Sequence, residues 1–285
     1  MSWAAEMEYL YHGDCFTGMK SLKPNSVDLV VTSPPYNFDM DYSDYNDKKK
    51  WDEYFKRMSE FAEVLFEKVK VGGRVAINIQ PLFSDFVPSH HYISEIFRAA
   101  GFKWRNEILW EKNNYNCKFT AWGSWKSASN PYFKYTWEFI EVFSKEQNGR
   151  AEKGVSDITA DEFKAWTISK WSIAPERKMK EFGHPAMFPQ EIPNRLVKLF
   201  SYVGDTILDP FMGLGTTGVI CRMTNRNFIG HELSRDYFER AVSRIESTPP
   251  NKACSGLGVC APSQALSTLE GYRLGGQFPT PAPSH

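Results

Sequence analysis

The sequence predicts an α/β fold with a mostly parallel central sheet. Short apolar segments bounded by turn residues alternate with longer segments in which apolar residues recur at helical spacing. Two of the short segments, VDLVV at 27–31 and RVAINI at 74–79, lack the regular alternation of apolar and polar residues. Near-continuous apolar strands of this kind are typical of parallel sheets that helices cover on both faces.

Turn residues and apolar content mark the individual elements. We expect strands at Tyr9–His12, Val27–Thr32, Arg74–Ile79, Ile108–Trp110, Phe139–Phe143, Thr206–Asp209 and Asn227–Gly230. Helical spacing predicts helices at Trp51–Lys68, Tyr92–Ala100, Gln190–Phe200, Thr216–Met223 and Arg235–Ile245. The first two of these helices are followed by glycines, which commonly end helices: Gly72, Gly73 and Gly101.

Two stretches interrupt this alternation. Residues 113–135 are polar and aromatic, and residues 148–187 contain no segment that we expect to join the sheet. Long irregular segments within a compact domain are commonly functional. From residue 247 onward Gly, Pro and Ser are frequent and charged residues are few, so we expect one folded domain at 1–246 and a disordered tail at 247–285.

The composition is that of an ordinary globular protein. Of 285 residues, 42% are hydrophobic and 24% are charged, and no run approaches the ~18 apolar residues of a membrane span. The first residues include Glu6 and Glu8 and show no signal-peptide pattern, and the five cysteines form no dense framework. We therefore expect reduced thiols in the cytoplasm. Cys254 and Cys260 have no further ligand nearby, so we expect no metal site.

Charge is balanced overall but segregated along the chain. Lys and Arg together number 34, as do Asp and Glu, so no net field draws the protein to nucleic acid. Residues 103–134 hold six basic and two acidic residues, and residues 164–180 hold five and one, whereas residues 39–67 hold nine acidic and five basic residues. The segregation permits a basic face, although solvated loops would show the same pattern.

A glycine-rich segment, DPFMGLGTTG at 209–218, follows an expected strand and opens an expected helix. Gly213 and Gly215 allow a tight turn and a close approach of the backbone to a ligand. The start of the helix offers unpaired amide donors, and Glu232 at the end of the next strand is placed to accept ribose hydroxyls. The combination predicts a cofactor with an adenosine ribose and leaves the identity of that cofactor open.

A second segment, Ser33-Pro34-Pro35-Tyr36, follows the strand expected at 27–32. Prolines have no amide hydrogen and a fixed φ, so this turn leaves carbonyl oxygens exposed and rigid. A carbonyl and the Ser33 hydroxyl together accept both hydrogens of a planar exocyclic amine, and Tyr36 offers a flat face to the attached base. The alternative is a plain Pro-Pro turn with a core tyrosine, but open α/β sheets bind ligands at the carboxyl ends of their strands.

Together the two segments resemble the amino-group DNA methyltransferases that use S-adenosylmethionine, in the circularly permuted beta-type motif order. The resemblance spans about residues 9–245 and implies a Rossmann-like methyltransferase sandwich with Ser33, Pro34, Pro35 and Tyr36 as the catalytic segment. The residues that it implies for the cofactor are Asp14, Cys15, His184, Phe188, Pro189, Asp209, Pro210, Phe211, Gly213, Gly215, Thr216, Thr217 and Glu232.

Ser33 bears on the acceptor. In this family a serine before Pro-Pro-Tyr usually marks cytosine-N4 enzymes, and an aspartate there usually marks adenine-N6 enzymes. The resemblance therefore implies methyl transfer to N4 of a cytosine flipped out of double-stranded DNA, in restriction–modification or epigenetic marking. Adenine N6 stays open as the acceptor. Alternatives of another class are a nucleotide-cofactor oxidoreductase that uses the turn at 213–218 and a DNA-binding module without catalysis.

DNA contacts are expected outside the family core. Segments 113–135 and 145–180 combine basic and aromatic residues, and such side chains hold phosphates and reach base edges. The candidates are Lys112, Lys118, Lys126, Lys134, Lys170, Arg177 and Lys178. We consider a homodimer and a cognate restriction endonuclease as further partners, and expect no membrane partner.

Overall fold

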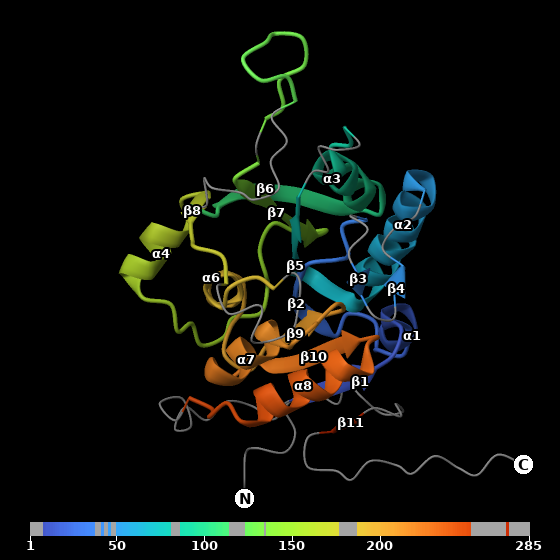
Figure 1. The fold of residues 1–285 in the computed structure, drawn as a ribbon. Coiled ribbons are helices and arrows are strands. Elements are labelled where there is room, and N and C mark those ends of the chain that lie inside the picture. The colour runs from blue at the N-terminus through green and yellow to red at the C-terminus, as the bar shows by residue number, and fades with distance from the viewer. Residues whose placement is uncertain are drawn as a thin grey trace, which may run out of the picture.

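The computed structural model describes residues 8–37, 41–42, 45–46, 50–80, 86–113, 123–133, 135–176, 187–251 and 272–273. Within these residues nine strands form one sheet in the order β11-β1-β10-β9-β2-β5-β7-β6-β8 (Figure 1). They are β1 (Glu8–His12), β2 (Val27–Thr32), β5 (Val69–Ile79), β6 (Phe102–Glu111), β7 (Trp137–Lys145), β8 (Lys170–Ser172), β9 (Thr206–Asp209), β10 (Asn227–Glu232) and β11 (Tyr272–Arg273). The run from β1 through β10, β9 and β2 to β5 is parallel, which confirms the predicted fold class.

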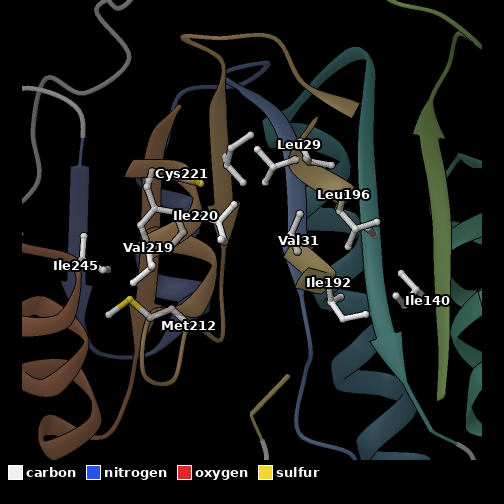
Figure 2. Close-up of a cluster of buried hydrophobic side chains, with 14 of the residues drawn as sticks. Leu29, Val31, Ile140, Ile192, Leu196, Met212, Val219, Ile220, Cys221 and Ile245 are labelled. Atoms are coloured by element: carbon white, nitrogen blue, oxygen red, sulfur yellow. The ribbon is translucent and has the colours of Figure 1, made fainter. Parts of the chain in front are cut away.

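Helices cover both faces of this sheet (Figure 1). One face carries α1 (Cys15–Lys20), α2 (Trp51–Lys68) and α3 (Ser89–Ala99), and the other carries α6 (Glu191–Phe200), α7 (Thr216–Met223) and α8 (Arg235–Glu246). In β2, Val30 packs with the first group of helices. Leu29 and Val31 pack with the second group, and Figure 2 shows them beside Ile192 and Leu196 of α6. β2 is therefore buried along its whole length. Among the described residues, no helix is long and apolar enough to cross a membrane.

The expected helices are confirmed, with small shifts at their ends. Apolar spacing explains them, since α2 buries side chains at steps of three and four residues, namely Tyr54, Met58, Phe61 and Leu65. α1 is a short helix that the periodicity does not reveal, and Asp14 caps its start.

Several strands differ from expectation. β5 begins at Val69, directly after α2, and not at Arg74. β6 begins at Phe102 and not at Ile108; the side chains in its first half are mostly exposed, so apolar content did not mark that half as a strand. The expectation that residues 148–187 contain no sheet strand is wrong, since β8 adds a three-residue edge strand parallel to β6. The same segment contains α4 (Ala160–Trp166), which a capping box between Thr159 and Glu162 begins.

Two further pairings involve short strands. β3 (Asp41–Tyr42) and β4 (Tyr45–Asn46) form a separate antiparallel pair. In the segment 247–285, for which we expect disorder, Tyr272–Arg273 form β11 and pair antiparallel with β1. Residues 252–271 and 274–285 lie outside the described part of the chain.

The antiparallel strand β7 determines which chain segments meet at the carboxyl edge of the sheet. β7 runs antiparallel to both β5 and β6. The end of β6 and the start of β7 therefore lie at the same edge as the carboxyl ends of the parallel strands. The chain between β6 and β7 leaves from this edge, and the Lys112 N–H donates to the Thr136 carbonyl across its base at 2.9 Å.

Arg226 provides a test of the fold. Its fully buried guanidinium donates to both oxygens of Asp157 at 2.7 Å and to the Ser201 carbonyl at 2.9 Å. Arg226 directly precedes β10, so these hydrogen bonds fix the chain that follows β7 to the amino end of β10.

Arg226→Met leaves these acceptors without a donor and should lower the free energy of unfolding by about 3–5 kcal/mol. Urea unfolding measures the loss. As a control, Arg240→Met removes an exposed pair with Asp236 and should cost less than about 1 kcal/mol. Equal losses in the two variants would contradict the role of the buried pair.

Candidate functional site

A cavity of about 370 Å³ lies at the carboxyl edge of the sheet. The segments after β1, β2, β5, β9 and β10 bound it, together with α2 and the adjacent ends of β6 and β7. The predicted site residues that line it are Asp14, Cys15, Ser33, Pro34, Pro35, Tyr36, Lys112, Phe188, Pro210, Phe211, Gly213, Thr216 and Glu232. The Ser33–Tyr36 segment and the glycine-rich segment, far apart in the sequence, thus share one cavity.

Other predicted residues lie behind this lining or outside the described residues. Pro189, Asp209, Gly215 and Thr217 are not part of the wall. The buried Pro189 accepts the Ile192 N–H at 3.0 Å near the start of α6. The residues on which the structure gives no information are His184, Lys118, Lys134, Arg177 and Lys178.

Asp209 is a buried carboxylate that joins the two segments. Its Oδ1 accepts from the Thr32 hydroxyl at 2.8 Å and from the Phe211 N–H at 3.2 Å, and its Oδ2 accepts from the Thr217 hydroxyl at 2.8 Å. One side chain thereby holds the end of β2, the glycine-rich turn and the first turn of α7. Burial raises the pKa of Asp209 to about 6, and the three hydrogen bonds oppose this rise.

The glycine-rich turn brings the start of α7 to the cavity. Gly213 and Gly215 have φ values of 51° and 71°, and Gly215 directly precedes the helix. A Cβ at Gly215 would lie 2.9 Å from Ile245 Cδ1 of α8, so both the backbone conformation and the packing require glycine there. Thr216, the first residue of α7, lines the cavity, so the start of this helix, with its unpaired amide donors, lies at the cavity wall.

Glu232 ends β10 beside this turn. Its Oε2 accepts from the Gly213 N–H at 2.9 Å, and its Oε1 accepts from the Ser234 N–H at 2.8 Å. Burial raises the pKa of Glu232, and these backbone donors lower it. Because each oxygen has a second lone pair, this fixed carboxylate suits the neighbouring hydroxyls of a ribose.

The segment after β1 adds a second carboxylate. Asp14 accepts from the Phe16 N–H at 3.0 Å and pairs with Arg57 of α2 at 2.9 Å. The Arg57 guanidinium also lies 4.5 Å from the centre of the Phe16 ring. Burial raises the pKa of the neighbouring Cys15 thiol to about 12, so Cys15 lines the cavity as a neutral side chain and not as a nucleophile.

The other half of the cavity is built around Ser33 and Tyr36. Ser33 Oγ lies 2.8 Å from Tyr36 Oη, and Tyr36 donates to Glu138 Oε2 at 3.2 Å. The Asn78 amide donates to Tyr36 Oη at 2.6 Å and to the same Glu138 oxygen at 2.5 Å. The hydroxyl of Tyr36 is therefore anchored, while the residue forms part of the cavity wall.

Sequence reasoning does not single out Asn78, Gln80 or Glu138, although all three line the cavity. Asn78 and Gln80 are polar residues at the carboxyl end of a buried strand, and that position is the signal that could have found them. Glu138 lies at the start of a strand, so its place at this edge depends on the antiparallel direction of β7.

Three of the basic residues expected to contact DNA lie in the described part. Lys112 lies inside the cavity and pairs with Glu138. Lys126 belongs to the segment 123–133, which projects from the molecule in Figure 1, and its Nζ lies 5.6 Å from the ring centre of the exposed Trp125. Lys170 pairs with Glu111 at 2.9 Å and is mostly exposed.

The cavity offers two different sets of groups. Near Glu232 it presents carboxylates and the amides of a helix start, which suit a ligand with a ribose. Near Ser33 it presents a hydroxyl and a rigid Pro-Pro turn beside an aromatic residue, which suit a planar amine. A single cavity that holds both ligands permits direct transfer of a group from one to the other.

A family model described as DNA methylase matches residues 27–243. Among curated proteins, the type II methyltransferase M.BglII of Bacillus subtilis is 28% identical over 285 residues, which cover 92% of this chain and 78% of that protein. The type II methyltransferase M.MjaI of Methanocaldococcus jannaschii is 30% identical over 257 residues, which cover 76% of this chain and 84% of that protein.

Solved structures show the same fold. TTHA0409 of Thermus thermophilus, solved with S-adenosyl-L-methionine, has a TM-score of 0.68 at 27% identity, over 85% of this chain and 95% of that one. PvuII DNA methyltransferase, which is cytosine-N4-specific, has a TM-score of 0.66 at 22% identity, over 84% and 86%, and bears on the fold alone. These similarities do not support a nucleotide-cofactor oxidoreductase.

Asp209→Asn tests the buried carboxylate. Because folding raises the pKa of Asp209 to about 6, the folded state binds the proton more tightly than the unfolded state. This group therefore favours folding as the pH falls. From about pH 7.5 to about pH 5, the ligand-free wild type should gain about 1 kcal/mol of unfolding free energy relative to the variant. Urea unfolding at both pH values measures the gain, and a pH-independent difference would contradict the buried charge.

Proposed function

The chain belongs to the DNA methylase family and is an S-adenosylmethionine-dependent DNA methyltransferase of the N4/N6 amino-group class, and we propose that its acceptor is N4 of a cytosine flipped out of double-stranded DNA. Ser33 carries the proposal. It lines the cavity that the glycine-rich turn shares, and its hydroxyl contacts Tyr36 at 2.8 Å. A serine at this position resembles the cytosine-N4 enzymes of the family, whereas an aspartate would indicate adenine N6.

The residues around Glu232 fit the cofactor. When bound, S-adenosylmethionine supplies an electrophilic methyl group on its sulfonium sulfur. Glu232 would hold the ribose hydroxyls, because both of its oxygens are already oriented by backbone donors. Gly213 and the start of α7 would lie along the same ligand, with Asp14 at the adenine end and Phe188 at the methionine end.

Ser33 and Pro34 would activate the acceptor. An aromatic exocyclic amine is a weak nucleophile because its lone pair is delocalised into the ring. The Ser33 hydroxyl and the Pro34 carbonyl accept the two amine hydrogens, which favours a pyramidal nitrogen with a localised lone pair. Positive charge develops on that nitrogen in the transition state, so acceptors that the fold fixes in advance stabilise it.

Tyr36 would hold the flipped base. The amine lies inside the stacked duplex, so the nucleotide must leave the stack at a cost of a few kcal/mol. Stacking on Tyr36 offsets about 1–3 kcal/mol of that cost. The hydrogen bonds of its hydroxyl to Asn78 and Glu138 keep the tyrosine in place before the base arrives.

The surroundings of the cavity would bind the duplex. The projecting segment 123–133, with Lys126 and Trp125, lies in the stretch of chain between β6 and β7. The backbone hydrogen bond from Lys112 to Thr136 joins the two ends of this stretch, and Lys112 also lines the cavity. Lys170 lies on the edge strand next to β6. Relatives named type II methyltransferases favour a role in restriction–modification or epigenetic marking. We further propose a homodimer and a cognate endonuclease as partners.

Glu232→Gln tests the cofactor assignment. The neutral amide loses charge-assisted hydrogen bonds, which are worth about 1.5–3 kcal/mol, so the affinity for S-adenosylmethionine should fall about ten- to hundredfold. Titration calorimetry measures the Kd. Glu239→Gln, at an exposed pair with Arg235 on α8, should keep the wild-type Kd. A wild-type Kd in Glu232→Gln would remove Glu232 from the cofactor site.

Nucleoside mass analysis tests the acceptor. Unmethylated duplex DNA is incubated with the protein and methyl-labelled S-adenosylmethionine and then digested. We expect label in N4-methylcytosine, and we expect Ser33→Ala to lower its rate of formation by on the order of a hundredfold. Label in N6-methyladenine would keep the reaction class but overturn the assignment to cytosine. The absence of label from DNA of varied sequence would contradict the proposal.

A further inference from the structure

A chain of hydrogen bonds leads from the amine-binding serine to a buried acid. Ser33 Oγ lies 2.8 Å from Tyr36 Oη, and Tyr36 Oη lies 3.2 Å from Glu138 Oε2. Glu138 is only 6% exposed, and its other oxygen pairs with the ammonium group of Lys112. Binding and activation of the amine use Ser33 and Tyr36 but leave Glu138 and Lys112 without a chemical task.

The direction of these hydrogen bonds follows from the groups themselves. An ionised carboxylate only accepts, so the Tyr36 hydroxyl and the Asn78 amide both donate to Glu138 Oε2. Tyr36 Oη then has two lone pairs, one of which accepts from Asn78 at 2.6 Å. The other accepts the Ser33 hydroxyl hydrogen. The lone pairs of Ser33 Oγ remain available to an amine hydrogen, so every hydrogen bond in the chain points toward Glu138.

The acid is costly to keep where it is. Removing a carboxylate from water costs several kcal/mol unless a partner compensates for its charge, and well-packed apolar residues often serve stability as well. Lys112 provides that compensation and, like Glu138, lines the cavity. A paired acid at the end of a hydrogen-bonded chain from the reacting amine indicates a chemical task and not packing alone.

We infer that Glu138 accepts the proton that the amine loses on methylation, by way of Ser33 and Tyr36, and that Lys112 holds Glu138 in place. The inference rests on the proposed function.

When the N–CH₃ bond forms, the nitrogen becomes positively charged and the donor sulfonium becomes a thioether. The N–H bond then breaks, its electron pair stays on nitrogen, and its proton moves to Ser33 Oγ. The Ser33 proton passes to Tyr36 Oη, and the Tyr36 proton passes to Glu138 Oε2. Glu138 becomes a neutral acid and returns its proton to water after the product leaves.

Glu138→Gln and Tyr36→Phe test this path. The first keeps the size of the side chain without the basic carboxylate, and the second keeps the aromatic ring without the hydroxyl. Each should lower the single-turnover rate of methyl transfer by on the order of a hundredfold, with unchanged Kd values for S-adenosylmethionine and duplex DNA. Because both changes break one path, the double variant should be no slower than the slower single variant. As a matched control, Glu162→Gln alters a Glu–Lys pair outside the cavity, with Lys198, and should react at the wild-type rate.

Rescue by a small acid separates proton acceptance from a structural role. Glu138→Ala leaves room for formate, so the single-turnover rate should rise with formate concentration and not with chloride at equal ionic strength. A wild-type rate in Tyr36→Phe or Glu138→Gln, independent multiplication of the two losses, or no response to formate would overturn the inference. Such results leave the proposed function intact if Ser33→Ala still lowers the rate of cytosine methylation by on the order of a hundredfold. A wild-type protein that does not methylate cytosine in DNA would instead reject the proposed function.

Discussion

The carboxylate of Asp209 is the joint on which the site depends. It accepts hydrogen bonds from Thr32 at the end of β2 and from Thr217 in the first turn of α7, both at 2.8 Å. The strand that presents Ser33 and the glycine-rich turn are therefore fixed to one buried side chain. Its desolvation raises its pKa to about 6, so this joint costs stability at neutral pH. In return, the hydrogen bonds of Asp209 fix the distance between the two halves of the cavity, and direct methyl transfer requires a fixed distance.

The direction of β7 is a second constraint. Because β7 is antiparallel to β5 and β6, Lys112 at the end of β6 and Glu138 near the start of β7 meet at the carboxyl edge of the parallel strands. The same turn of the chain carries the projecting segment with Lys126. Lys126, which is proposed to contact DNA, and Glu138, which anchors Tyr36, therefore belong to one continuous stretch of chain from β6 to the start of β7. This stretch would bring duplex binding and base capture close together.

The sequence was sufficient for the parts of the site that are local. The strands at 27–32 and 206–209, the glycine-rich turn and the Ser33–Tyr36 segment are contiguous signals, and each lies where its pattern predicts. Arg57, Asn78 and Glu138 complete the cavity from other elements, and no linear spacing links them to the motifs. β8 is too short for a periodic pattern, so its pairing with β6 emerges only in the folded chain. The capping box at Thr159 and Glu162 was a readable sign of α4.

The methyl donor and a flipped base would occupy one cavity at the same time. The most direct measurement is a crystal structure of the protein with duplex DNA and sinefungin, an analogue of the cofactor that has an amine in place of the sulfonium methyl. We predict that the adenosine of the analogue lies against Glu232 and the start of α7, with an extrahelical cytosine whose amine faces Ser33. A target base that stays stacked in the duplex, or an analogue that occupies the Ser33–Tyr36 half of the cavity, would contradict this account.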